Sequence, residues 1–174
     1  MVRAVAISAG AMKLFVIVLL LLGGAGCAST ATSYLVGSQV PAVRFTMMNG
    51  ARVSADSFRG KRVVIAFWAT HCSRSKQMLR HLADVAQSGV QKGGVAFVAP
   101  SIDPQEKLSA VQERELSLNV SNVEFAFSGN DVEDEAYLLL EGKSIPYIVI
   151  LDRDGSIMYA GGEYTLMKSF LEKP

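Results

Sequence analysis

The sequence predicts an α/β domain with a mixed central sheet, helices on both faces and an N-terminal β-hairpin. Short apolar runs alternate with segments whose apolar residues recur at helical spacing, as in proteins with helix-covered sheets. The last two predicted strands are joined by a tight turn, so they run antiparallel and make the sheet mixed. The chain has 174 residues, half of them hydrophobic, which is enough for one core plus an extension.

The expected elements follow one another with short connections. Along the chain they are a hairpin (43–47 and 51–54), a strand (62–68), a helix (72–88), a strand (95–99), a helix (103–116), a strand (123–127), a helix (132–140), two strands (146–151 and 157–160) and a helix (165–171).

The first elements rest on specific local signals. Asn49-Gly50 between two alternating segments is a strong hairpin turn signal. The apolar run after Arg62 is typical of a strand buried on both faces. The helix that follows ends at Gly89, a residue that commonly terminates helices.

Later elements are delimited by breakers and turns. Residues 95–99 form another buried strand, and Asp103-Pro104 is typical of a helix start. Gly142 ends the helix predicted over 132–140. Residues 152–155 (Asp-Arg-Asp-Gly) are interpreted as a hairpin turn, because the later acidic ligands of a calcium loop are missing.

The first 27 residues resemble a bacterial lipoprotein signal. Lys13 precedes an apolar run over 14–22, which is too short to cross a bilayer but fits a signal peptide. Small residues lead to Cys27, the predicted lipid attachment site, although Gly24 stands where that motif usually has a larger aliphatic residue. The alternative is an uncleaved signal anchor. Both interpretations place the protein outside the cytoplasm on a membrane. Ala28, rather than an aspartate, follows Cys27, which favours the outer membrane.

The remaining chain divides into a tether over 28–38 and a domain over 39–174. The tether is small and mostly polar. Without residues 1–27 the chain has 15 basic and 16 acidic side chains and no basic block, which gives no reason to expect nucleic acid as a partner. A disulfide between Cys27 and Cys72 is the alternative to lipidation of Cys27.

Cys72 lies where a buried strand gives way to a helix. Peptide dipoles and unpaired N–H groups at a helix start favour the thiolate, and Arg74 and Lys76 add positive charge. The alternative is an inert core cysteine. His71 is more consistent with a solvent-facing side chain than with a direct Cys–His pair, because adjacent residues at a helix start point in different directions. No metal site is expected.

Several ordered motifs resemble the thioredoxin fold, specifically its membrane-anchored TlpA/ResA-type branch within the AhpC/TSA-like superfamily. The motifs are Phe67-Trp68-Ala69-Thr70-His71-Cys72 after a hydrophobic strand, Phe58-Arg59-Gly60-Lys61 before it, and Ile145-Pro146 followed by Tyr-Ile-Val-Ile-Leu-Asp-Arg-Asp-Gly. The resemblance implies that Cys72 is the nucleophile and that Pro146 is a cis-proline beside it. It also implies that the backbone of Ile145 pairs with bound peptide. We expect the side chains of Trp68, His71 and Arg74 to bind the substrate as well. No cofactor is implied.

The sequence departs from that family at three positions. Ser75 replaces the second cysteine of Cys-x-x-Cys, and a hydroxyl can hydrogen-bond to a thiolate but cannot displace a disulfide sulfur. Ala66 replaces a buried acid or amide, and Arg80 replaces a proline that kinks the helix. An internal dithiol–disulfide cycle is therefore excluded.

Three functions remain open. The first is monothiol thiol–disulfide exchange through Cys72, with Ser75 and Pro146 in the site, a thiol- or disulfide-bearing protein as partner and an outside thiol or reductase for resolution. The second is a non-catalytic binding or assembly lipoprotein. The third is a one-cysteine peroxidase, which is disfavoured because Ala69 stands where peroxiredoxins have threonine.

Overall fold

A computed structural model describes residues 35–88 and 94–172, which belong to a compact unit spanning Thr32–Pro174. The predicted signal segment and Cys27 lie outside the described residues. The predicted tether lies outside them up to residue 34. Its last described residues bond to the domain, because the Gly37 N–H donates to the Ile157 carbonyl and the Ile157 N–H donates to the Ser38 carbonyl.

The described residues form two sheets. The strands are β1 (Arg44–Thr46), β2 (Arg52–Ser54), β3 (Arg62–Phe67), β4 (Val95–Pro104), β5 (Glu124–Gly129), β6 (Tyr147–Leu151) and β7 (Ile157–Gly161). The main sheet has the order β5-β4-β3-β6-β7, with β3, β4 and β5 parallel and with β6 and β7 antiparallel to their neighbours. β1 and β2 form a separate antiparallel hairpin. The predicted fold class, a thioredoxin-like mixed sheet with a hairpin addition, is confirmed.

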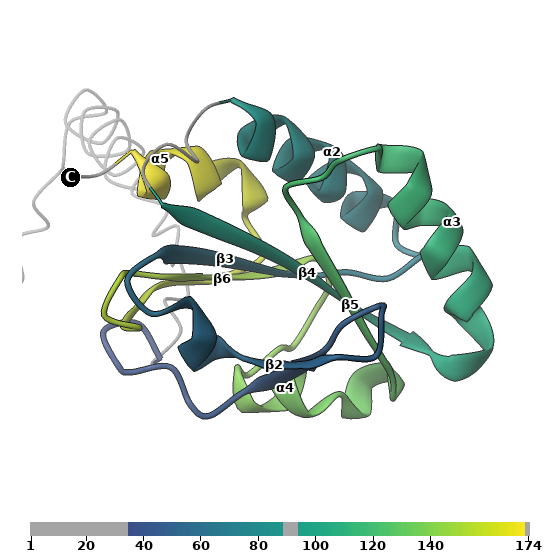
Figure 1. Cartoon of the computed structure of the whole chain (residues 1–174), viewed down its shortest axis with the longest axis horizontal. Helices are drawn as coiled ribbons and strands as arrows, with labels where there is room; N and C mark the ends of the chain where they lie inside the picture. The colour runs from purple at the N-terminus through teal and green to yellow at the C-terminus, as the bar shows by residue number, and fades with distance from the viewer. Residues whose placement is uncertain (1–34, 89–93, 173–174) are drawn as a thin grey trace, which may run out of the picture. The chain divides into compact units, whose positions relative to one another are not determined.

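Helices cover both faces of the main sheet (Figure 1). The α-helices are α2 (Ser73–Gln87), α3 (Leu108–Leu118), α4 (Glu135–Leu139) and α5 (Met167–Leu171). Short 3₁₀ turns precede three of them and also follow β2: η1 (Ala55–Phe58), η3 (Gln105–Lys107), η4 (Asp131–Glu133) and η5 (Tyr164–Leu166). α2, α3 and α5 pack on one face, and the hairpin and α4 on the other.

Strand β3 lies at the centre of the sheet and is buried along its whole length. Successive side chains alternate between the two faces of a strand. Val64, Ala66 and Trp68 accordingly join the core under α2, whereas Ile65 and Phe67 join the core under the hairpin. This double burial holds the carboxyl end of β3, and therefore the start of α2, in one position.

Three predicted helices begin differently in the structure, and the start of the first was wrong by five residues. The segment at Asp103-Pro104 continues β4, which pairs with β5 as far as Pro104 and Gly129, and α3 begins only at Leu108. The helix expected over 132–140 is a 3₁₀ turn followed by α4, and the helix expected over 165–171 begins as η5. In each case the first turn has the tighter 3₁₀ geometry that is common at helix ends.

Candidate active site

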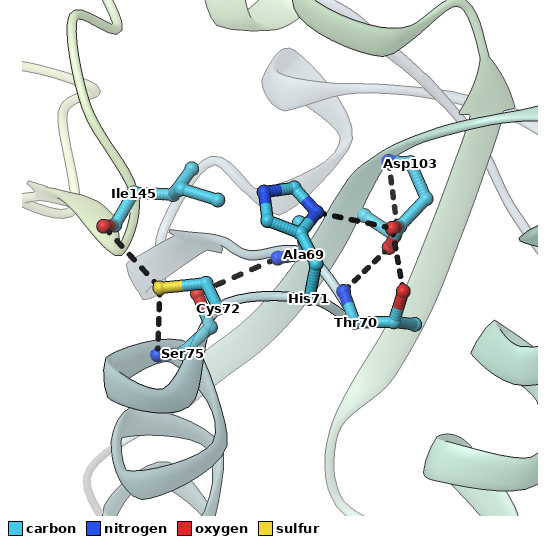
Figure 2. Close-up of polar contacts among 8 residues, drawn as sticks. Ala69, Thr70, His71, Cys72, Ser75, Asp103 and Ile145 are labelled. Atoms are coloured by element: carbon cyan, nitrogen blue, oxygen red, sulfur yellow. Dashed lines mark hydrogen bonds and ion pairs between the residues drawn. The ribbon is translucent and has the colours of Figure 1, made fainter.

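Cys72 is the N-cap residue of α2 (Figure 2). Its backbone is extended, with φ of −89° and ψ of 117°, and its Sγ accepts the backbone N–H of Ser75 at 3.4 Å. N-terminal N–H groups of a helix have no partner within the helix, so a sulfur that accepts one of them caps the helix. The thiol is partly exposed and is the free cysteine among the described residues.

Ser75, which the sequence analysis compared with the second cysteine of Cys-x-x-Cys, is fully buried. Its Oγ accepts the backbone N–H of Ala69 at 3.4 Å, while its hydroxyl hydrogen-bonds to the Cys72 side chain. A hydroxyl can accept one bond and donate another at the same time. Ser75 therefore ties the loop after β3 to the helix and directs a proton donor at the sulfur.

The surroundings of Cys72 favour its ionised form. Partial burial raises the pKa of the thiol, but hydrogen bonds from the Ser75 hydroxyl and from the backbone N–H groups of Ser75 and Arg74 lower it, as does the charge of Arg74. Together the lowering effects exceed the effect of burial, and the pKa lies below the ordinary value of a thiol. A lower pKa increases the thiolate fraction near neutral pH, and the thiolate is the reactive species.

The Ile145-Pro146 peptide bond is cis, and it lies across from Cys72. The protonated Cys72 Sγ donates to the Ile145 carbonyl at 3.6 Å. Pro146 is buried and Ile145 is partly exposed. The structure therefore brings together Cys72, Ser75, Ile145 and Pro146, all of which the sequence analysis had selected.

The side chain of Trp68, a predicted substrate contact, packs in the core under α2. The side chain is fully buried, its ring N–H donates to the Ala99 carbonyl at 3.1 Å, and its ring meets Phe125 edge to face. Ala66 is also fully buried, and its methyl side chain has no proton to transfer, whereas Arg80 is exposed on α2.

His71 and Arg74 are both exposed beside the thiol. The His71 side chain is 73% exposed, in agreement with a solvent-facing imidazole, but its Nδ1 lies 3.9 Å from Asp103 Oδ1. Arg74 acts electrostatically on both Cys72 and Glu163, so it is near the sulfur without being buried.

Asp103 is the residue of this site that the sequence analysis missed. Its side chain is 1% exposed, and its carboxylate accepts the Thr70 N–H at 2.8 Å, the Thr70 hydroxyl at 2.7 Å and the Ser101 hydroxyl at 2.7 Å. The available signal was a carboxylate four residues beyond a buried strand, a position where parallel sheets gather functional groups. We had assigned it instead to the start of a helix.

The described residues contain no group of three or more histidine, cysteine or acidic side chains that could hold a metal ion. Nor do they contain a helix that is both long and apolar enough to span a membrane.

A comparison with protein families identifies the chain. The model of the AhpC/TSA family matches residues 36–160, which include every residue of the site described above. The chain belongs to the AhpC/TSA family. No relative was found among curated protein sequences.

Solved structures similar to this AhpC/TSA protein have thioredoxin-like folds. The thioredoxin domain of a thiol-disulfide oxidoreductase from Bacteroides vulgatus has a TM-score of 0.63 and 22% identity, covering 79% of this chain and 98% of that one. A thiol-disulfide oxidoreductase from Bacteroides fragilis has a TM-score of 0.65 and 17% identity, covering 77% and 97%. A secreted disulfide oxidoreductase of Mycobacterium tuberculosis, homologous to Escherichia coli DsbE, has a TM-score of 0.60 and 19% identity, covering 74% and 93%. At these identities the likeness establishes the fold.

Proposed function

We propose that this AhpC/TSA protein is a monothiol thiol–disulfide exchanger that acts through Cys72 outside the cytoplasm. The observation that carries the proposal is the environment of the sulfur. Cys72 Sγ caps α2 by accepting the Ser75 N–H, and it accepts a hydrogen bond from the Ser75 hydroxyl. The pKa of the thiol is lowered. The sulfur also faces the carbonyl of Ile145, which precedes the cis-proline. A partly exposed thiol with a lowered pKa is the usual form of a reactive cysteine.

The exchange has two steps in which atoms and electrons balance. In the first, the Cys72 thiolate attacks one sulfur of a partner disulfide, forms a mixed disulfide and releases the other partner sulfur as a thiolate. In the second, a thiol from another molecule attacks the partner's sulfur in the mixed disulfide. A disulfide then forms between partner and outside thiol, and Cys72 leaves as a thiolate.

Residues around Cys72 have separate roles in this proposal. Ser75 donates to the thiolate and thereby lowers the energy of Cys72 both as nucleophile and as leaving group. Ile145 and Pro146 present backbone across from the sulfur, where an extended peptide can lie. The exposed side chains of His71 and Arg74 contact the partner.

The test is the reaction of purified full-length protein with a disulfide-bonded peptide. Intact mass under non-reducing conditions should show one peptide attached to Cys72, and the adduct should persist until an outside thiol is added. Cys72→Ala should form none, and Ser73→Ala is a matched control at a neighbouring exposed position. Absence of any adduct with the native protein would refute the exchange function.

We further propose that the chain is a lipoprotein attached through Cys27. The support is the signal-like segment that ends at Cys27, together with the secreted state of the Mycobacterium tuberculosis neighbour. Cys27→Ala should release the protein from the membrane fraction, and the N-terminal peptide of native protein should carry acyl mass. Sucrose-gradient fractionation distinguishes the outer from the inner membrane. An unmodified Cys27 in membrane-bound protein would instead support an uncleaved anchor.

A binding or assembly role without exchange is the second candidate. It is favoured by the absence of any acid or amide at Ala66, which is fully buried beneath the site, and by the buried hydroxyl at Ser75. On that function Cys72→Ala retains full activity in cells at normal abundance. Loss of activity in that variant counts against a purely structural role.

A one-cysteine peroxidase is the least favoured candidate. Position 69 is a buried alanine, so it supplies no hydroxyl to a bound peroxide. Consumption of hydrogen peroxide in the presence of an outside thiol, lost in Cys72→Ala, would support peroxidase activity.

A further inference from the structure

Asp103 is a buried carboxylate for which the exchange reaction described above has no role. Three hydrogen bonds anchor it to the residues that precede the thiol and to its own strand: the Thr70 N–H and the Ser101 hydroxyl donate to Oδ2, and the Thr70 hydroxyl donates to Oδ1. Oδ1 thus keeps capacity for a second donor, because a carboxylate oxygen accepts two. A charge at 1% exposure is costly unless it is bonded, so this arrangement is held in one geometry.

The imidazole of His71 lies near Oδ1, the Asp103 oxygen that can accept a second hydrogen bond. Its Nδ1 lies 3.9 Å from Oδ1, within ion-pair range but longer than a hydrogen bond. Facing a carboxylate, Nδ1 is favoured to carry the proton, which leaves Nε2 as the acceptor. In Figure 2 the ring nitrogen of His71 that faces Asp103 points away from Ile145 and Cys72, and the other ring nitrogen is on the side where those residues lie.

Other charged groups near this loop come from two helices. A cleft of about 260 Å³ is lined by Thr70 and by three charged residues, Lys76 of α2 and Glu113 and Arg114 of α3. Arg74 acts on the thiol from the first turn of α2. These groups are partly or fully exposed and are screened by solvent, whereas Asp103 is buried and lies against the same loop, so Asp103 is the fixed charge that faces the imidazole.

We infer that His71, positioned by Asp103, is the general base that activates the outside thiol when it resolves the mixed disulfide on Cys72. The inference rests on the proposed exchange function and assigns a catalytic residue to its second step. A chain without an internal resolving thiol depends on a small or protein thiol that arrives mostly protonated. A base at the edge of the site deprotonates this thiol and so makes it an effective substitute for the missing second cysteine.

The proton and electrons balance in that step. Nε2 of His71 takes the proton of the incoming thiol as its sulfur bonds to the partner's sulfur, and the sulfur–sulfur bond to Cys72 breaks. Cys72 leaves as a thiolate that Ser75 stabilises by hydrogen bonding. The imidazolium formed on His71 donates Nδ1–H towards Asp103 and afterwards returns its extra proton to solvent. Asp103 touches no reacting atom, so it is a positioning residue.

The experiment follows release of a neutral reporter peptide from a preformed mixed disulfide on Cys72. 2-Mercaptoethanol serves as the outside thiol, because an uncharged thiol is not attracted or repelled by Lys76, Glu113 or Arg114. Release rates are measured from pH 5 to 9. Alkylation of the free thiol over the same range is measured in parallel, so changes at Cys72 itself can be subtracted.

His71→Gln is the decisive variant, because the side chain is exposed and its removal leaves the core intact. Native protein should release the peptide faster than the thiolate fraction of 2-mercaptoethanol alone allows, with the additional rate rising over the interval in which imidazoles change charge, about pH 5 to 8, and then levelling off. The variant should lose this additional rate, so that its release follows the thiolate fraction alone, and should release the peptide about tenfold more slowly at pH 7. His81→Gln removes the other histidine, half-buried on α2, and should keep the native profile.

Asp103→Asn tests the positioning role. Its oxygen can accept the Thr70 N–H while its NH₂ group donates to the Thr70 hydroxyl, which places a donor against His71 Nδ1 and disfavours the productive tautomer. Release of the peptide should be slower than in native protein, as in His71→Gln. The rate at which free Cys72 is alkylated should be unchanged. A native pH profile in His71→Gln overturns the inference alone. Failure of Cys72 to form any mixed disulfide overturns the exchange function and the inference together.

Discussion

Two buried charges lie at opposite ends of the parallel pair β3 and β4, and they are paired in different ways. Arg62 begins β3 at 3% exposure, with Nε 3.1 Å from Asp152 Oδ1 and Nη1 3.1 Å from the Leu171 carbonyl. Asp103, near the end of β4, accepts hydrogen bonds from neutral groups, and its ion pair is with the exposed His71 at 3.9 Å.

The difference separates a structural end of the sheet from a chemical one. At the Arg62 end, charge and countercharge meet within hydrogen-bond distance and join β3, the β6–β7 turn and α5. At the Cys72 end, the polar groups of Thr70, His71 and Cys72 border the opening of the site. Changes at the Arg62 end should therefore alter stability without altering the reactivity of Cys72, and changes at the Cys72 end should alter that reactivity most.

Ser75→Cys should have the largest effect, because it restores an internal resolving thiol. Attack within one molecule replaces attack by a dilute outside thiol, and release of a mixed disulfide should accelerate at least about a hundredfold without added thiol. Mass measurement of adduct decay checks this, with Ser73→Cys as the matched control at an exposed position. Unaltered dependence on outside thiol would contradict the proposed placement of Ser75 as the missing resolving group.

Arg62→Met should cost about 1–3 kcal/mol of unfolding free energy, because it leaves the Leu171 carbonyl and Asp152 without their charged donor. Urea unfolding measures the loss. Lys168→Met removes an exposed pair with Glu172 at 3.7 Å and should cost no more than about 0.5 kcal/mol. The rate of Cys72 alkylation should be native in both variants. A changed pH dependence of that alkylation in Arg62→Met would contradict the claim that the Arg62 end affects stability alone.

Ser75→Ala should slow alkylation of Cys72 at pH 7 by severalfold, because a higher pKa leaves less of the reactive thiolate at that pH. The change removes the hydroxyl that lowers the pKa of Cys72 but keeps the helix start. It also leaves the Ala69 N–H without its acceptor, at a cost of about 1 kcal/mol. An unchanged alkylation rate would assign the lowered pKa to the helix backbone and Arg74 alone.

The smallest expected effect is the loss of unfolding free energy at low pH, when Asp152 at the Arg62 end becomes protonated. The backbone N–H of Arg153 and then the Arg62 side chain lower the pKa of Asp152 against the opposing effect of burial. A carboxyl whose pKa is lower in the folded state stabilises the fold above its unfolded pKa of about 3.9, and this contribution is lost as pH falls through the folded pKa. Unfolding free energy measured from pH 5 to 2 should fall less in Asp152→Asn than in native protein, by less than about 1 kcal/mol.

The strands and the thiol were predictable because their signals are local. Apolar runs buried on both faces identified β3 and β6, Asn49-Gly50 identified the hairpin, and the change from strand to helix placed Cys72 at the start of α2. The burial of Trp68 was not predictable from its position, because an aromatic residue beside a cysteine is equally consistent with a contact surface and with core. Only its alternation with Phe67 across β3 places it under α2.

Asp103 could not be predicted because its role depends on a contact between distant segments. Pro100 and Pro104 suggest breaks in a strand, yet β4 continues through both while pairing with β5 on one side. Only the parallel pairing of β3 with β4 brings Asp103 under Thr70, a residue 33 positions earlier. No spacing along the chain encodes that proximity.

The most direct test of the central claim is the rate of Cys72 alkylation by iodoacetamide as a function of pH. The full-length native protein is compared with its unfolded form in denaturant, where Cys72 has no neighbours. The account predicts a folded midpoint clearly below the unfolded one, which should lie near 8.5. A folded midpoint equal to or above the unfolded value would contradict the claim that the start of α2 and Ser75 hold Cys72 ready as a thiolate.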